Sequence, residues 1–88
     1  MLNYTMIENV SLSLFKEAII MFAEIWSNCQ SQNSMEVYNN VTKYILNNGG
    51  KMLAGKSTKF LVFSIWKFDG LMIYIELFGD DCGYRLLN

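Results

Sequence analysis

The chain contains no histidine and no proline among its 88 residues. Histidine is the commonest general base and the commonest metal ligand, so its absence weakens the case for both kinds of site. The candidate nucleophiles Ser57, Ser64 and Cys82 have no imidazole to activate them. Adjacent aspartates such as Asp80 and Asp81 more often initiate a turn than bind a metal. We therefore expect no catalytic residues, no metal and no cofactor, and a protein that is not an enzyme.

Cysteines and uninterrupted apolar runs are also scarce. Cys29 and Cys82 lie far apart without metal-site spacing, and we expect buried free thiols in a reducing compartment. Charges at Lys16, Glu17 and Glu24 interrupt the most hydrophobic N-terminal segment, which argues against a membrane span. The N-terminus lacks the basic region that begins a secretory signal. We expect a cytoplasmic protein that has no membrane partner.

Acidic residues are missing from the middle of the chain, although the net charge is only −1. No aspartate or glutamate occurs between Val37 and Phe68, and acids outnumber bases on both sides of this stretch. Such zoning indicates either an anionic partner or attraction between segments of the chain itself. The lysines of the acid-free stretch are Lys43, Lys51, Lys56, Lys59 and Lys67.

Apolar side chains, by contrast, are abundant. Hydrophobic residues make up 52% of the chain and aromatic residues 15%, which excludes a disordered protein. The length predicts a single domain that spans residues 1–88, near the size at which one core gives marginal stability.

A wide apolar stripe predicts an N-terminal helix. The run from Thr5 to Glu8 has capping-box spacing, so the helix is expected to begin at Met6, or later, near Ser11 or Ser13. Apolar residues then recur at steps of three and four, as on one face of a helix. The stripe consists of Ile7, Val10, Leu14, Phe15, Ala18, Phe22, Ile25, Trp26 and Cys29.

A second helix is predicted after the polar linker at residues 30–33. Asn33 or Ser34 is expected to cap its N-terminus, with Glu36 favourably placed in the first turn. The run Asn48-Gly49-Gly50 is expected to end it, because glycine adopts the left-handed C′ conformation without steric cost. Its buried stripe contains Val37, Tyr38, Val41, Tyr44 and Ile45.

The strongest local signal in the chain is the Asp69-Gly70 pair between two runs rich in aromatic and β-branched residues. These residue types predict a hairpin with a type I′ turn, because both tolerate positive φ angles. The register then places Phe68 opposite Leu71. Because side chains alternate along a strand, one face of the hairpin is nearly all apolar and is predicted to face the core. That face comprises Phe60, Val62, Ser64, Trp66, Phe68, Leu71, Ile73, Ile75 and Leu77.

After the hairpin, the run Asp80–Gly83 predicts a turn and Tyr84–Leu87 a short third strand. The predicted order is therefore helix, helix, strand, strand, strand. We expect an α+β fold in which two N-terminal helices pack on one face of a three-stranded antiparallel sheet.

The stretch Gly50–Ser57 matches the Walker A spelling G-x-x-x-x-G-K-[ST]. A true phosphate-binding loop follows a strand and opens a helix, whose N-terminus attracts the phosphate. Here a predicted helix precedes the stretch and strand formers follow it. We interpret it as a flexible connection and keep Lys51, Lys56 and Lys59 as the residues of an alternative anion-binding segment.

Two classes of function remain open. The first is a small interaction protein that inhibits or adapts a larger protein partner, with self-association as a homodimer. The asparagine-rich, proline-free composition would suit a phage or other mobile element in a low-GC host, where inhibitors of the anti-defence type abound; this is an association and not a physical argument. The second is a module that binds a nucleotide or nucleic acid through the lysine segment. The expected partner-binding or dimer face comprises Ile20, Met21, Leu61, Phe63, Ile65, Tyr74 and Phe78.

Overall fold

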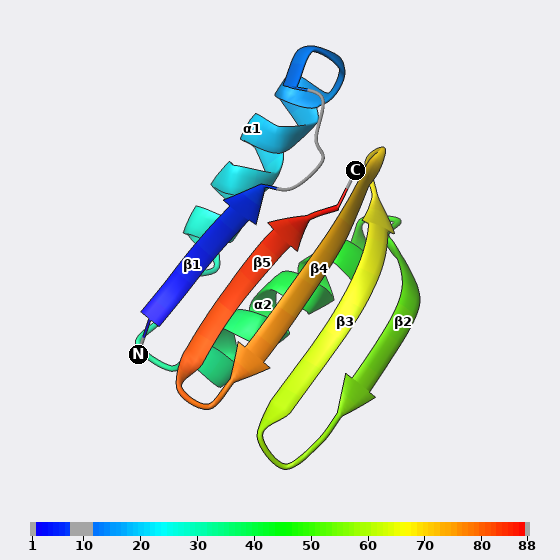
Figure 1. The fold of residues 1–88 in the computed structure, drawn as a ribbon. Coiled ribbons are helices and arrows are strands. Elements are labelled where there is room, and N and C mark those ends of the chain that lie inside the picture. Colours follow the sequence, from blue (N-terminus) through cyan, green and yellow to red (C-terminus); the bar gives the residue numbers. More distant parts are fainter. Residues whose placement is uncertain (1, 8–11, 88) are drawn as a thin grey trace.

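The computed structural model describes residues 2–7 and 12–87, with side chains from Lys16 onward, and shows both helices on one face of a sheet (Figure 1). The class is α+β, as predicted. The prediction of three strands is wrong, because the sheet has five, in the order β1-β5-β4-β3-β2. The elements are β1 (Leu2–Ile7), α1 (Leu12–Asn28), α2 (Ser34–Asn47), β2 (Lys51–Ser57), β3 (Leu61–Phe68), β4 (Leu71–Phe78) and β5 (Asp81–Leu86).

The first unpredicted strand is β1, which occupies the segment where a helix start at Met6 was predicted. It pairs parallel to β5, from Leu2 opposite Asp81 to Ile7 opposite Leu86. The capping-box spacing is a local signal, whereas this pairing joins the two ends of the chain. Tertiary pairing therefore overrides a weak local preference, in a segment whose tyrosine, threonine and isoleucine suit a strand.

Helix α1 begins at Leu12, which agrees with the later of the two predicted starts. Glu8, Val10 and Ser11, which also entered the prediction, lie outside the described residues. Within the described part of the chain, neither helix is long and apolar enough to cross a membrane.

The second unpredicted strand is β2, where a flexible connection was predicted. It runs antiparallel to β3, from Lys51 opposite Lys67 to Ser57 opposite Val62, and a β-bulge interrupts the register after Met52. All seven of its residues are exposed. An edge strand that buries neither face needs no alternation of apolar and polar residues, so periodicity could not detect it.

The hairpin is confirmed together with its register. Phe68 pairs with Leu71, and the pairing continues without a shift along β3 and β4. Asp69 has φ 53° and Gly70 has φ 80°, the positive values that a type I′ turn requires at both central residues. The turn therefore fixes which hairpin residues face the helices.

The core lies between the helices and the predicted apolar face of the hairpin. The rings of Phe22 from α1 and Tyr84 from β5 form a T-shaped pair, with centroids 4.8 Å apart. Phe60 is an error in the predicted core face: it lies in the turn before β3 and is 68% exposed. The buried apolar residues are Phe22, Ile25, Trp26, Val37, Val41, Ile45, Trp66, Phe68, Leu71, Ile73, Ile75, Leu77, Cys82, Tyr84 and Leu86.

Helix α2 has the predicted ends. Asn33 is the N-cap, and its side chain accepts hydrogen bonds from the backbone amides of Met35 and Glu36. Asn48 is the C-cap, and Gly49 follows with φ 89°, the left-handed conformation expected there. Local capping chemistry therefore determined both boundaries.

The last strand was predicted too short. β5 begins at Asp81 and not at Tyr84, because the turn that precedes it contains Gly79, with φ 60°, and Asp80. The predicted turn at Asp80–Gly83 is therefore placed too late in the chain.

Candidate protein-binding surface

The sheet has one side that the helices do not cover, which we call the open face (Figure 1). Phe63 and Ile65 of β3 point to this side, as do Tyr74 and Phe78 of β4, because they alternate with the buried residues of the same strands. Phe78 is 55% exposed, and the other three are half-buried. No described element packs on the open face, so an apolar surface meets solvent there.

The centre of the open face is an ordered aromatic group. The rings of Phe63 and Tyr74 stack with centroids 5.5 Å apart and planes 25° apart. The guanidinium carbon of Arg85 lies 5.7 Å from the centroid of the Tyr74 ring, within the range of a cation–π contact. These contacts hold the rings in place before any partner binds, which lowers the entropy lost on association.

Lysines border the aromatic group on the β2 side. Lys56 pairs with Phe63, and Lys51 pairs with Lys67, so all three lysines lie on the open face. Lys59 lies apart from them, in the turn before β3, with its Nζ 5.4 Å from the centroid of the Phe60 ring. The structure therefore separates the predicted anion-binding set and adds Lys67 to Lys51 and Lys56.

The predicted partner-binding residues lie in two separate places. Leu61, like Phe63 and Ile65, belongs to the open face. Ile20 and Met21 belong to α1, in the layer on the other side of the sheet, where they are 50% and 39% exposed. The sequence prediction identified both patches. Only the structure shows that they lie on opposite sides of the sheet, so that one flat partner surface cannot contact both.

The sequence prediction missed an apolar groove between α2 and the turn before β3. Met35 is 59% exposed on one side of it, Phe60 lies on the other, and Val62 and Leu77 also line it. The exposure of Phe60 was missed because strict alternation had assigned this residue to the core. Thr58 and Lys59 supply the polar side chains of the groove.

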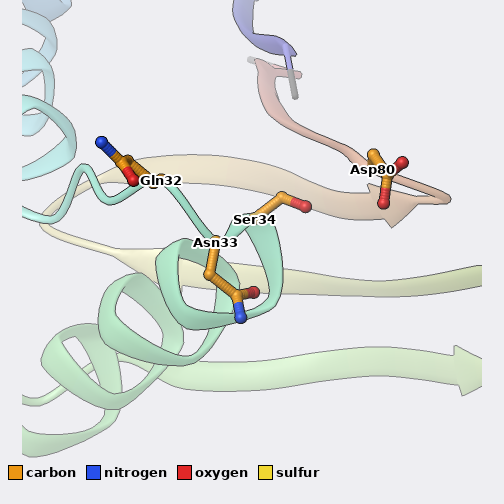
Figure 2. A pocket seen from close by; sticks show the side chains of 4 residues that line it. All are labelled: Gln32, Asn33, Ser34 and Asp80. Carbon is orange, nitrogen blue, oxygen red and sulfur yellow. The ribbon is translucent and has the colours of Figure 1, made fainter.

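A polar hollow lies at the N-terminus of α2, lined by residues from the preceding loop and from the β4–β5 turn (Figure 2). Asn33 Oδ1 already accepts the amides of Met35 and Glu36 at 3.0 and 3.3 Å, so the helix end is capped by its own chain. Among the described residues that line this hollow, Asp80 is the only titratable group, so they include no acid–base pair. The cap explains the stability of the helix end. The lining residues are Gln32, Asn33, Ser34 and Asp80.

Two of the three candidate nucleophiles, Ser64 and Cys82, are buried in the core, whereas Ser57 is exposed at the end of β2. Ser64 Oγ accepts a hydrogen bond of 2.7 Å from Trp66 Nε1 and lies 2.9 Å from the hydroxyl of Tyr38. Burial and the nearby charge of Glu76 raise the pKa of Cys82 to about 12. A thiol with such a pKa is protonated at neutral pH, and the thiolate is the nucleophilic form. Ser64 and Cys82 therefore belong to the core.

Both cysteines are free thiols, as predicted. Cys82 is fully buried, as predicted, whereas the prediction of a buried Cys29 is wrong, because this residue is half-buried. Its partial burial still raises the pKa of Cys29. Within the described residues, no three histidine, cysteine or acidic side chains form a group that could hold a metal ion.

Comparison of the chain with protein-family models, with curated proteins and with solved structures finds no match in any of the three.

Proposed function

We propose that the chain is a small, non-enzymatic interaction protein whose open face is a protein-binding surface. The observation that carries this proposal is the apolar, aromatic surface of β3 and β4, which no described element covers. Burial of apolar surface stabilises a complex by about 25 cal/mol per Å². Interfaces are enriched in aromatic residues and arginine, the residue types that meet at Phe63, Tyr74 and Arg85.

The first occupant that we propose for the open face is a second copy of the chain, in a homodimer. Strands about 4.8 Å apart with a rise of about 3.4 Å per residue give β2–β5 a face of about 19 by 27 Å. Because side chains protrude from the sheet, the accessible area of such a face is larger than its flat area and approaches the roughly 800 Å² per partner of a standard interface. A twofold axis lets one such patch cover itself, which is the commonest symmetry of small oligomers.

A homodimer formed in this way leaves the α1 patch of Ile20 and Met21 available on each copy. We propose that this patch binds the larger protein that the dimer inhibits or adapts. Two copies of the patch on one dimer would raise the effective concentration of the second contact after the first has formed.

Sedimentation equilibrium at micromolar concentration, with matched variants, tests the homodimer. Phe78→Glu changes a residue of the open face that is 55% exposed, and Ile20→Glu is the control on α1, with 50% exposure. We expect the native chain and Ile20→Glu to sediment as dimers and Phe78→Glu as a monomer near 10.2 kDa. A native chain with the monomer mass throughout, or a dimer broken only by Ile20→Glu, would contradict the proposal.

A second candidate function is supported by the lysines of the open face. Lys51, Lys56 and Lys67 border the stacked rings of Phe63 and Tyr74. Proteins that bind single-stranded nucleic acid combine a basic groove with aromatic rings on which bases stack. Fluorescence anisotropy with a labelled oligonucleotide separates the candidates, because phosphate contacts weaken steeply as salt concentration rises. Lys56→Ala should weaken such binding more than the control Lys43→Ala on α2, whereas equal effects or no binding would exclude this function.

A further inference from the structure

Strand β2 ends the sheet, and no described element lies beside its outer edge (Figure 1). In a paired edge strand, one set of backbone amides and carbonyls bonds the inner neighbour and the alternate set points outward. Those outward groups lie in the plane of the sheet and not on the open face. The edge therefore offers a template for a further strand. The backbone groups of the edge are separate from the open face of the proposed function, whereas the side chains of an added strand would extend that face.

The side chains around this edge carry charge of one sign. Lys51 and Lys56 are exposed on β2, Lys67 lies opposite Lys51 on β3, and all three occupy the open face. No acidic residue occurs between Val37 and Phe68, so these lysines have no acidic neighbour within the segment. A strand added at this edge would place its own open-face residues beside Lys51 and Lys56, where acidic side chains are favourable.

The same charges disfavour a second copy of β2 at this edge. Residues directly opposite each other in a pair of strands share a face of the sheet. In an antiparallel pair of two β2 strands, opposite residues must lie on the same face of the sheet. The longest pairing that meets this condition places Met52 opposite Gly55 of the second copy, because both lie on the helix side. That register places Lys51 opposite Lys56 of the second copy, and it does so twice by symmetry. Like charges directly opposite each other destabilise a strand pair.

We infer that the outer edge of β2 binds an extended acidic segment of another protein as a sixth strand. The open-face partners of Lys51 and Lys56 on β3 are Lys67 and Phe63, four residues apart, because the bulge in β2 absorbs one residue. A regular added strand therefore carries its two acidic residues four positions apart. Between them it has an apolar residue opposite Ala54, whose small side chain leaves room for a larger one. The recognised pattern is acidic-x-apolar-x-acidic.

NMR titration of the isotope-labelled chain with synthetic peptides tests this inference. The probe is Thr-Glu-Thr-Val-Thr-Glu-Thr, and the charge control is Thr-Lys-Thr-Val-Thr-Lys-Thr. A third peptide keeps the glutamates but has N-methylated backbone amides along both sides of the extended chain. It therefore cannot donate the backbone hydrogen bonds of a strand pair. We expect the probe to shift and protect the amides of β2, and both control peptides to bind at least about tenfold more weakly.

Charge reversal in the protein provides the matched test. The double variant Lys51→Glu/Lys56→Glu should exchange the preference, so that the lysine peptide binds and the glutamate peptide does not. The control Lys16→Glu/Lys43→Glu makes the same change in net charge on exposed positions of α1 and α2 and should keep the native preference. Because all four lysines are exposed, none of these changes is expected to unfold the chain.

Three results would overturn the inference. Equal binding of the N-methylated peptide would show attraction by charge without strand pairing. Absence of peptide binding at β2 would show that the lysines only protect the edge from aggregation. Concentration-dependent protection of the outward β2 amides without peptide, in the Phe78→Glu variant that lacks the open-face dimer, would make a second copy the occupant of the edge. A chain that stays monomeric in sedimentation refutes the homodimer and leaves this test intact, so the two proposals fail separately.

Discussion

Removal of the Ser64 hydroxyl is expected to destabilise the fold by the cost of leaving one buried N–H donor without an acceptor. Trp66 is only 5% exposed, and its Nε1 donates to Ser64 Oγ at 2.7 Å. In Ser64→Ala that N–H has no acceptor, and an unsatisfied buried group costs about 1–3 kcal/mol. The hydroxyl of half-buried Tyr38 also loses this partner but can turn toward water, so we expect a total loss of about 2 kcal/mol.

Urea denaturation followed by Trp fluorescence measures this loss. For a domain of this size the midpoint should fall by about 1–2 M in Ser64→Ala. Ser57→Ala on the exposed strand β2 is the matched control and should change stability by less than about 0.5 kcal/mol. A double-mutant cycle tests whether the lost hydrogen bond to the indole N–H causes the destabilisation. In the Trp66→Phe variant, which lacks this donor, Ser64→Ala should cost at least about 1 kcal/mol less than in the native chain. An equal loss in both backgrounds would refute the assignment of the cost to the indole N–H.

Three further changes have defined outcomes. Trp66→Ala should cost roughly 3–5 kcal/mol in denaturant melts as a large-to-small core change, and a loss below about 1 kcal/mol would contradict the burial of this ring. Lys56→Ala should leave stability nearly unchanged, and ATP or GTP turnover that disappears in this variant would overturn the proposal that the chain is not an enzyme. The pKa of Cys82 is about 12 in the folded chain, against about 8.5 for an unfolded cysteine. The contribution of the protonated Cys82 thiol to the free energy of unfolding is therefore complete below about pH 8.5 and is lost as the pH rises toward 12. Melts across this window should give a steeper fall in the free energy of unfolding for the native chain than for Cys82→Ala, and parallel slopes would exclude Cys82 as the cause.

Local signals in the sequence determined the elements whose stability comes from neighbouring residues. The Asp69-Gly70 turn required two positive φ angles that these residue types tolerate, and the structure has both. Asn33 capped α2 because its side chain reaches the amides two and three residues later. From the turn, strict alternation assigned the two faces of the hairpin, and so predicted the residues of the open face before any tertiary contact was known.

Tertiary structure decided what local signals could not carry. β1 is a strand because it meets β5 at the other end of the chain, and no window of sequence contains both partners. β2 is a strand because β3 offers its hydrogen-bonding edge, although β2 buries neither of its own faces. Hydrophobic periodicity reveals a strand only where one face of the strand is buried, so it cannot detect a strand that is held by backbone hydrogen bonds alone.

The same division applies to the candidate surfaces. The sequence alone identified an apolar hairpin face and a stretch of lysines without acids. Only the pairing of β2 with β3 placed Lys56 beside Phe63 and separated Lys59 from it. Charge and apolarity are properties of residues and can be read along the chain, whereas their juxtaposition depends on strand order and register, which the whole fold determines.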